Sequence, residues 1–448
     1  VRDNKKHMEE MEKQGFETID LVVINLYPFE KVISKEKVTL EEAIENIDIG
    51  GPTMLRSAAK NNRYVGVICN PAKYAEVLDE LRRNKGALSE ETKFKLAIEV
   101  FERTSEYDKT IAGFLRLNSP FAVSSESKSF PQILEIKFEK IQDLRYGENP
   151  HQKAALYKIH NSKFGSPDII EAKQLHGKEL SFNNILDLQS AWDVVNDFEN
   201  PAVCIIKHNN PCGVAEAETL LQAYLDALEC DPLSAFGGIV GLNRIVDKRT
   251  AEEIYNFEFT ECIIAPRYEP EALEILKRKK NLRILELTDT KHQKEIDEFD
   301  LRKISGGALI QEKDNLNVDK NKLKIVTKKK PTEEQIRSLL FADRVVKHVK
   351  SNAIVLVQGT KTVGIGMGQT SRVDAVIIAL RKAGERAKGA CLASDAFFPK
   401  PDGVEEAVKG GVKAIIQPGG SISDEEIIAC ADKWGIVMVF TGIRHFKH

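Results

Sequence analysis

The stretch V-C-I-I-K-H-N-N-P-C-G, residues 203–213, joins an apolar run to a lysine, a histidine and a turn-forming sequence. A continuous apolar run is typical of a strand buried on both faces of a sheet, and α/β sheets bind ligands beyond the carboxyl ends of such strands. The segment therefore predicts Lys207 and His208 at a sheet edge, with residues 209–211 forming the turn. A surface lysine beside a hydrogen-bonded histidine fits it equally well.

Length and composition are those of a globular protein with two or three domains, since 448 residues are too many for one core. The net charge of -3 gives no overall bias toward nucleic acid or a membrane surface. No apolar run reaches the ~18 residues of a membrane span, and no signal peptide opens the chain. We expect a cytoplasmic protein with reduced thiols, because the seven cysteines are scattered without a C-x-x-C pair.

Apolar and amphipathic segments alternate along the chain, which predicts an α/β fold. Strands are expected at 21–26, 64–69 and 203–206, and helices at 39–47, 89–117 and 182–197. The last part predicts a helix at 333–349, a strand at 353–357, a glycine hairpin, a helix at 372–382, a strand at 414–416, a helix at 425–434 and a strand at 437–440. It could be a second lobe resembling the first, although no sequence repeat is visible.

Two polar segments suggest domain boundaries. The stretch at 123–129 has the composition of a linker, and a lysine run at 328–330 meets Pro331 before a helical pattern. We therefore expect domains at 1–128, 129–330 and 331–448.

Five further segments could bind a ligand, and each has a structural alternative. R-Y-G-E-N-P-H-Q (145–152) suits a phosphate or a planar base, or is a polar loop. G-I-G-M-G-Q-T-S-R (364–372) could place amides around an anion at a helix start, or is a hairpin without a ligand. D-I-G-G-P-T-M-L-R (48–56) offers a similar loop or a capped helix.

The two remaining segments contain aromatic residues. S-D-A-F-F-P (394–399) provides either a stacking platform or two core phenylalanines. R-H-F-K-H (444–448) is either a tail folded back into a site or a frayed basic end.

Taken together, these segments resemble the bifunctional purine-biosynthesis enzymes that join AICAR transformylase to IMP cyclohydrolase. The resemblance runs nearly end to end and rests on nine motifs in order. They are N-L-Y-P-F (25–29), I-D-I-G-G-P-T-M-L-R-S-A-A-K-N (47–61), L-R-Y-G-E-N-P-H-Q (144–152), K-H-N-N-P-C-G (207–213), S-A-F-G-G (234–238), S-N-A-I (351–354), G-Q-T-S-R (368–372), S-D-A-F-F-P (394–399) and R-H-F-K-H (444–448).

The resemblance implies a methylglyoxal-synthase-like N-terminal domain followed by two cytidine-deaminase-like lobes, working as a homodimer. It implies transfer of a formyl group from the co-substrate 10-formyltetrahydrofolate to the amine of AICAR, followed by closure of formyl-AICAR to IMP. Lys207 and His208 match the catalytic pair. Positions that match substrate or folate contacts are Arg145, Tyr146, Asn184, Phe236, Gly237, Asn352, Arg372, Phe397, Asp402, Arg444, Phe446 and His448. Those that match the cyclohydrolase site are Tyr27, Asp48 and Lys60.

The chain also departs from the family pattern. The family's K-T-L-H-P phosphate-binding segment is not in this sequence, which starts at V-R-D-N, so the cyclohydrolase domain is expected to be partial and ring closure weak. Glu261 stands where some relatives carry Asp, which leaves its role open. Zinc is not expected, because His208 and Cys212 lack the H-x-E and P-C-x-x-C pattern of zinc deaminases.

Two other classes of function remain alternatives. One is a nucleotide or folate binding module that has lost catalysis, against which the intact Lys207-His208 pair argues. The other is a metal-dependent deaminase or hydrolase on the same fold.

Overall fold

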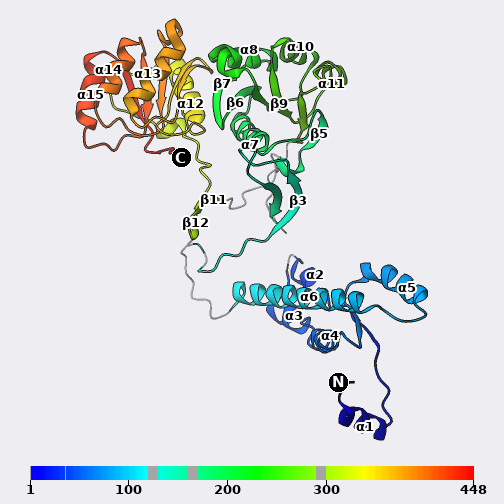
Figure 1. The fold of residues 1–448 in the computed structure, drawn as a ribbon. Helices are drawn as coiled ribbons and strands as arrows, with labels where there is room; N and C mark the ends of the chain where they lie inside the picture. Colours follow the sequence, from blue (N-terminus) through cyan, green and yellow to red (C-terminus); the bar gives the residue numbers. More distant parts are fainter. Residues whose placement is uncertain (1, 36, 120–129, 131, 160–168, 289–298) are drawn as a thin grey trace. The chain divides into compact units, whose positions relative to one another are not determined.

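The structure is a computed structural model that describes every residue except 1, 36, 120–129, 131, 160–168 and 289–298 (Figure 1). The chain forms two compact units, residues 1–134 and 135–448. The linker predicted at 123–129 lies outside the described residues. Within the described part, no helix is long and apolar enough to cross a membrane.

The first unit surrounds a small parallel sheet with helices. Its elements are α1 (Lys5–Lys13), β1 (Leu21–Val23), α2 (Phe29–Ile33), α3 (Leu40–Glu45), α4 (Gly50–Lys60), β2 (Gly66–Ile68), a 3₁₀ turn (Pro71–Lys73), α5 (Tyr74–Arg83) and α6 (Glu90–Leu117). β1 and β2 pair in parallel, as expected from the alternating pattern. The Thr39 and Ser89 side chains cap α3 and α6, which explains where these two predicted helices begin.

The core of the first unit is formed by apolar side chains of α4, β2 and α6. Leu55, Val67 and Val100 are fully buried there. A second cluster places Phe29 against Tyr107 in an edge-to-face contact, with ring centroids 6.3 Å apart. The helices therefore bury an apolar stripe against the short strands.

The second unit is larger and is built on one sheet. Its first elements are β3 (Phe138–Leu144), β4 (Ala154–Ile159), β5 (Lys173–His176), α7 (Phe182–Asn196), β6 (Ala202–Lys207), β7 (Asn210–Glu216), α8 (Leu220–Cys230), α9 (Pro232–Ala235), β8 (Gly238–Leu242), α10 (Lys248–Asn256), β9 (Thr260–Ala265), α11 (Pro270–Lys277) and β10 (Arg283–Glu286). A hairpin follows, made of β11 (Phe299–Ile304) and β12 (Gly307–Glu312). The remaining elements are β13 (Lys324–Ile325), α12 (Glu333–Val346), β14 (Ile354–Gln358), β15 (Lys361–Gly366), α13 (Arg372–Ala383), β16 (Cys391–Ser394), α14 (Asp402–Lys409), β17 (Ala414–Gln417), α15 (Asp424–Lys433) and β18 (Val437–Phe440).

The large sheet has twelve strands in the order β13-β18-β17-β16-β14-β15-β7-β6-β8-β9-β10-β5. Its two halves repeat one topology. In each half a helix leads into an antiparallel hairpin (β6–β7 or β14–β15), the next strand pairs antiparallel to the first hairpin strand, and two further strands follow in parallel. The second lobe therefore resembles the first in structure, although the sequence shows no repeat.

The halves meet where β7 lies beside β15. The Thr362 hydroxyl accepts a hydrogen bond from the Val214 amide at 2.9 Å and donates one to the Val214 carbonyl at 3.1 Å. The Glu216 amide donates to the Thr360 carbonyl nearby. One continuous sheet thus carries both lobes.

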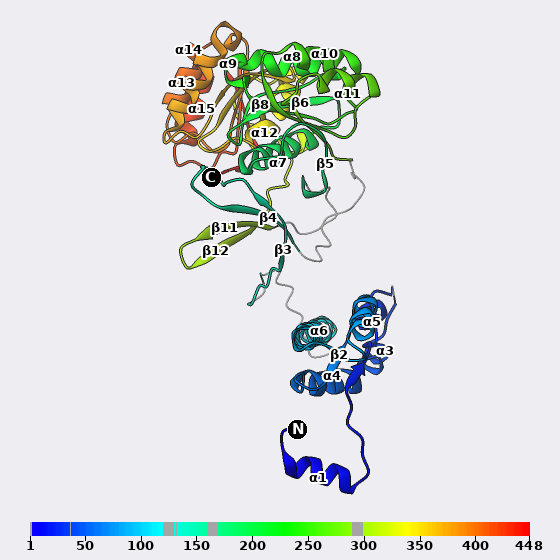
Figure 2. The same ribbon diagram turned by 45° about the vertical axis from the view of Figure 1, so that its right-hand side comes forward.

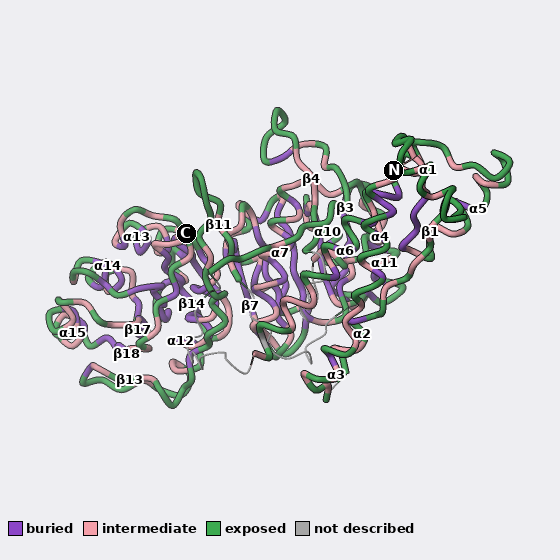
Figure 3. Tube along the Cα trace, turned by 90° about the horizontal axis from the view of Figure 1, so that it is seen from below, coloured by how far each residue is buried: buried purple, intermediate pink, exposed green. Residues whose placement is uncertain are grey.

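Helices cover both faces of this sheet. α7 and α12 pack on one face, while α8, α10 and α11 cover the other face of the first lobe, and α13, α14 and α15 that of the second (Figure 2). Side chains alternate along β6, with Cys204 and Ile206 facing α7, and Val203 and Ile205 facing α8. The buried residues follow the strands and the inner faces of the helices (Figure 3).

The structure corrects two local predictions. β6 is antiparallel to both neighbouring strands. Lys207 and His208 therefore lie at the turn of a β-hairpin and not at the end of a parallel strand. Gly364 and Gly366 lie inside β15 and not in a ligand loop. A β-carbon on Gly366 would lie 1.9 Å from the Ala375 carbonyl oxygen, so these glycines permit close packing of α13 on the strand.

Candidate functional site

The turn between β6 and β7 presents the predicted catalytic pair. β6 ends at Lys207 and β7 begins at Asn210, so the two turn residues are His208 and Asn209 and not residues 209–211 as predicted. Both have left-handed backbone, with φ of 53° and 59°. This is the geometry of a type I′ hairpin, whose twist matches that of the strands.

Lys207 is oriented by the neighbouring strand connection. Its Nζ donates to the Phe236 carbonyl at 2.7 Å, and Gly237 follows with φ of 72°. The Phe236 ring is partly exposed and lies against Phe259, with centroids 5.4 Å apart. The predicted residues Phe236 and Gly237 therefore lie beside the predicted catalytic lysine.

Asn184 has a structural role in addition to any role in binding. Its side-chain oxygen accepts from the Ser181 amide at 3.0 Å, and the Ser181 hydroxyl accepts from the Asn184 amide at 3.1 Å. This reciprocal pair is a capping box that starts α7.

A pocket of about 420 Å³ in the second lobe collects six of the predicted binding residues. They are Asn352, Arg372, Phe397, Asp402, Arg444 and Phe446. Phe398 is fully buried and belongs to the core, whereas Phe397 is partly exposed and lines this pocket. Guanidinium groups beside aromatic rings suit an anionic ligand with a planar ring.

Arg372 is the buried anchor of this pocket. Its guanidinium donates to the Ser394 hydroxyl at 2.8 Å, to the Asn352 side-chain oxygen at 2.6 Å, and to the Asp395 carboxylate. Asp395 is fully buried and also accepts from the Ser351 hydroxyl. The positive charge of Arg372, at the start of α13, is therefore paired with Asp395 inside the protein.

The C-terminal residues fold back into the site, which confirms that alternative over a frayed tail. The Ser351 amide donates to the Lys447 carbonyl at 2.9 Å. The Arg444 guanidinium lies 4.5 Å from the Phe446 ring centroid, and the His448 ring lies edge-on to Phe446. His445 is buried, and its Nδ1 lies 2.7 Å from the Asp314 carboxylate.

The hairpin turn and the pocket are joined by hydrogen bonds. The Lys350 amide donates to the Asn210 side-chain oxygen at 3.1 Å, and the Gly368 amide donates to the Lys350 carbonyl at 2.7 Å. Asn352, two residues after Lys350, lines the pocket. The two lobes thus bring the Lys207-His208 turn next to the segment 350–352, which precedes β14 and contributes Asn352 to the pocket.

Arg145 and Tyr146 lie on a loop that does not line this pocket. The Arg145 guanidinium is 5.6 Å from the Tyr146 ring centroid, so the two side chains stack on one another. The loop contacts α7 where the Asn183 amide donates to the Glu148 carbonyl. Within this chain, the structure does not bring these two residues to the other nucleotide-binding candidates.

The predicted cyclohydrolase residues occupy the first unit. The Tyr27 amide is 3.4 Å from the Asp48 carboxylate, which also accepts from the Gly51 amide at 2.7 Å and so caps α4. Lys60 is the last residue of that 11-residue helix, which places it about 16 Å from the capped end. Tyr27 and Asp48 are therefore neighbours, while Lys60 is separate.

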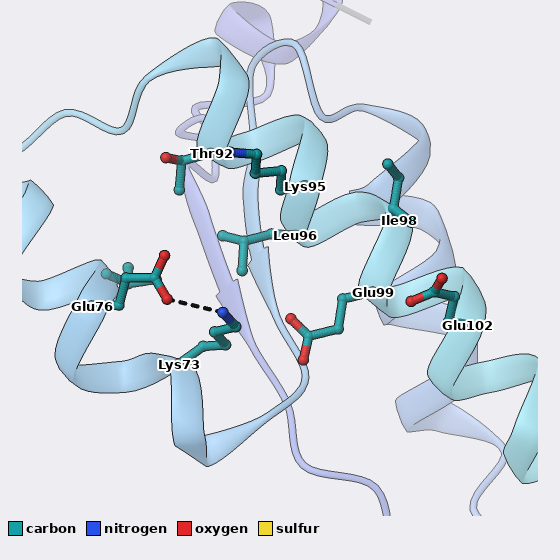
Figure 4. A pocket seen from close by; sticks show the side chains of 9 residues that line it. Lys73, Glu76, Thr92, Lys95, Leu96, Ile98, Glu99 and Glu102 are labelled. Carbon is teal, nitrogen blue, oxygen red and sulfur yellow. Dashed lines mark hydrogen bonds and ion pairs between the residues drawn. The ribbon is translucent and has the colours of Figure 1, made fainter. Parts of the chain in front are cut away.

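The first unit also has an open hollow of about 400 Å³ that the sequence did not indicate (Figure 4). Lys73 and Glu76 form an ion pair at its wall, and Glu99 and Glu102 project from α6. None of the predicted site residues lines it.

Two acidic residues have partners that the sequence analysis missed. Asp187 of α7 accepts from the turn residues His208 and Asn209. Glu261 pairs with Arg283 at 2.6 Å, which gives this residue a structural partner. No signal in the sequence could have paired Asp187 with a turn about twenty residues away.

Among the described residues, no group of three or more His, Cys, Asp and Glu side chains is arranged to hold a metal ion. All seven cysteines are free, as predicted. Burial raises the pKa of the Cys212 thiol to about 12, which keeps it protonated.

Comparison with known proteins places the chain in a family. The model of the AICARFT/IMPCHase bienzyme matches residues 58–382, and that of the MGS-like domain matches residues 2–53. Proteins called "Bifunctional purine biosynthesis protein PurH" are 54% identical in Thermoanaerobacter sp. (strain X514), 53% in Acetivibrio thermocellus and 52% in Bacillus cereus (strain AH820). Each alignment spans all 448 residues of this chain and 85% of the relative.

Among solved structures, "Crystal structure of ForH" is 27% identical over 26% of this chain and 60% of its own, and its TM-score of 0.21 is too low to bear on the fold. The family models cover most of the chain, and the identity to the PurH proteins extends along its whole length. The resemblance seen in the nine motifs is thereby confirmed: the chain belongs to the AICARFT/IMPCHase bienzyme family of bifunctional purine-biosynthesis proteins.

Proposed function

We propose that Lys207 and His208 carry out formyl transfer from 10-formyltetrahydrofolate to the 5-amine of AICAR. The observation that carries this assignment is the hydrogen bond between Asn210 and Lys350, which joins their hairpin to the segment that contributes Asn352 to the pocket. The reaction is one step of purine biosynthesis, and its products are formyl-AICAR and tetrahydrofolate.

The two side chains have complementary roles in this reaction. The AICAR amine attacks the formyl carbon and must lose a proton, which the His208 imidazole accepts as general base. The formyl oxygen gains negative charge as the tetrahedral intermediate forms, and the Lys207 ammonium stabilises that charge. Collapse of the intermediate breaks the bond to the folate nitrogen, which leaves with a proton.

The pocket supplies the binding energy. Arg444 offers a guanidinium to the nucleotide phosphate, while Phe397 and Phe446 offer rings to a planar base or pterin. Asn352 and Asp402 line the same cavity and supply polar contacts, with Arg372 anchoring its floor. His448, whose ring contacts Phe446, belongs to the same wall.

Arg145 and Tyr146 are assigned to nucleotide binding through assembly of a homodimer. Two features support an assembly. Their loop projects from β3–β4, a two-stranded hairpin with exposed apolar side chains at Phe138 and Tyr157. The β11–β12 hairpin likewise exposes Leu301 and Leu309. Isolated two-stranded hairpins are marginally stable, so an additional partner suits both.

The first unit is assigned to closure of formyl-AICAR to IMP, with Tyr27, Asp48 and Lys60 as its contributors. Tyr27 and Asp48 lie together at the start of α4, and Lys60 lies at its end. We further propose that the chain has three domains, with boundaries at residues 128 and 330, and that the protein is cytoplasmic.

One assay tests these assignments. The 448-residue protein is incubated with AICAR and 10-formyltetrahydrofolate, tetrahydrofolate release is followed, and formyl-AICAR is separated from IMP. Lys207→Ala and His208→Ala should each abolish release without changing the thermal unfolding midpoint of the second unit. Retained turnover in either variant rejects its catalytic role, and folate release without any IMP formation rejects the assignment of the first unit to ring closure.

A further inference from the structure

The His208–Asn209 turn has an unusual backbone for its sequence. Left-handed φ is uncommon for residues that carry a β-carbon, although histidine and asparagine adopt it more often than most of them. The equivalent turn of the second lobe, between β14 and β15, also has two residues and places Gly359 at its left-handed position, with φ of 59°. The second lobe has a glycine at the first turn position, where the first lobe has a histidine with a similar positive φ.

Asp187 is the group that holds this turn. It lies in α7, and its carboxylate accepts from the Asn209 amide at 2.6 Å and from the His208 amide at 3.3 Å. The Asn209 side chain reaches the same helix at the Ser190 hydroxyl, 3.0 Å away. One carboxylate therefore receives both amides of the left-handed pair.

The environment of Asp187 suits this task. Burial raises its pKa, while the hydrogen bonds from Asn209 and His208 and the nearby His208 ring hold the pKa down. α7 itself is fixed by the capping box at Ser181 and by Leu188 and Trp192, which are buried in the core. The Asp187 carboxylate thus belongs to a well-fixed helix and accepts hydrogen bonds from a turn with left-handed backbone.

We propose that Asp187 is a positioning residue for formyl transfer, fixing the backbone of His208 so that its imidazole and the adjacent Lys207 face the substrate. This inference rests on the proposed function of Lys207 and His208. Asp187 acts through the two amides and contacts no substrate itself. Its loss lets the turn relax from the left-handed conformation, and such a displacement of a catalytic group lowers the rate of the chemical step while leaving substrate binding in the pocket unchanged.

The test compares two variants with a matched control. Asp187→Ala removes both acceptors, whereas Asp187→Asn keeps one acceptor oxygen and loses the charge. Asp247→Ala is the control, because Asp247 also accepts a backbone amide, that of Thr250 at 2.9 Å, but it caps the distant helix α10. Steady-state kcat and the KM for AICAR and for 10-formyltetrahydrofolate are measured for the full chain, together with the thermal unfolding midpoint.

The expected result is a split between the two kinetic parameters. Asp187→Ala should lower kcat by roughly 10- to 100-fold with each KM within about threefold of the unmodified protein. The kcat of Asp187→Asn should lie between that of Asp187→Ala and that of the unmodified protein, and more than about twofold below the latter. Asp247→Ala should lower the thermal unfolding midpoint without a comparable loss of kcat. A kcat for Asp187→Asn within about twofold of the unmodified protein overturns the proposal even if Asp187→Ala does not fold.

A double-variant cycle separates positioning from general stability. Asp187→Ala is combined with His208→Asn, since asparagine tolerates left-handed backbone and keeps the turn accessible. If Asp187 acts largely through His208, adding Asp187→Ala to His208→Asn should lower the residual kcat by a smaller factor than Asp187→Ala lowers the kcat of the unmodified protein, and the remaining loss reports on Lys207. If Asp187→Ala lowers kcat by the same factor in the unmodified protein and in His208→Asn, the role of Asp187 is rejected and that of His208 is not. If His208→Asn by itself leaves kcat unchanged, the proposed role of His208 is rejected.

Discussion

Replacing Arg372 by methionine measures how far a buried ion pair supports the floor of the pocket. The guanidinium is almost fully buried and contacts Asp395, which is 0% exposed, together with Ser394 and Asn352. Methionine fills similar space but leaves the Asp395 carboxylate without the guanidinium. Removing one partner of a buried ion pair costs about 3–5 kcal/mol, because the remaining charge stays desolvated. We expect the second unit to lose stability by that amount.

Urea unfolding followed by tryptophan fluorescence is suited to this measurement. The chain has two tryptophans, Trp192 and Trp434, and both belong to the second unit, so the signal reports on that unit. Arg381→Met on the exposed face of the same helix is the matched control and should change stability by less than about 0.5 kcal/mol.

A second variant shows whether charge causes the effect. In Arg372→Met with Asp395→Asn, the buried group is uncharged, so the double variant should be more stable than Arg372→Met alone. A loss below about 1 kcal/mol for Arg372→Met, or a double variant that is even less stable, would refute the reasoning.

Three further predictions concern stability. Burial raises the pKa of Asp343 from 3.8 to about 6, so the folded chain keeps a proton that the unfolded chain releases, and stability falls as pH rises from about 4 to 6. Asp343→Asn should remove a pH-dependent change in unfolding free energy on the order of 3 kcal/mol across that range, as measured by urea unfolding. Burial alone would raise the pKa of Asp197, but the hydrogen bond from His348 and the charges of His348 and Lys347 lower it to about 2. The ionised Asp197 therefore stabilises the folded chain at neutral pH, and this stabilisation is lost as pH falls from about 4 to 2. Asp197→Asn should therefore weaken the acid dependence in that window, and an unchanged acid limb would contradict the sign. Finally, Gly213→Ala places a β-carbon 1.9 Å from the Ala227 carbonyl oxygen and should lower the unfolding free energy by about 3 kcal/mol. Gly113→Ala in α6, where a β-carbon would have no atom within 4 Å, should raise it by about 0.5–1 kcal/mol. Thermal melting followed by circular dichroism measures both changes.

Element types were predictable wherever the local pattern was strong. The helices that begin after Thr39, Ser89 and Ser181 follow from capping residues ahead of amphipathic stretches. Strand direction was not predictable, because an apolar run such as 203–206 suits a parallel strand and a central antiparallel strand equally. The glycines at 364 and 366 were misplaced for a related reason: only the approach of α13 shows that they pack under a helix.

The candidate site was partly predictable from the motifs. Six of the residues matched through the family resemblance line one pocket, although they come from segments as distant as Asn352 and Phe446. Arg145 and Tyr146 match the same resemblance but lie on another loop of this chain. Motif matching identifies residue types, and it does not show which protomer or which wall of a site each residue serves.

The family, the alternation of strands and helices, and the identity of the chemical groups can be inferred from the order of residues along the chain, because each depends on local patterns. Which of these groups come into contact is known only from the packing of the folded chain. Asp187 reaches the His208 turn, Asp314 reaches His445, and Asp395 receives Arg372 because the packing of helices on the twelve-stranded sheet brings distant segments within hydrogen-bonding distance. Such contacts depend on how whole elements pack, and no local pattern in the sequence encodes them.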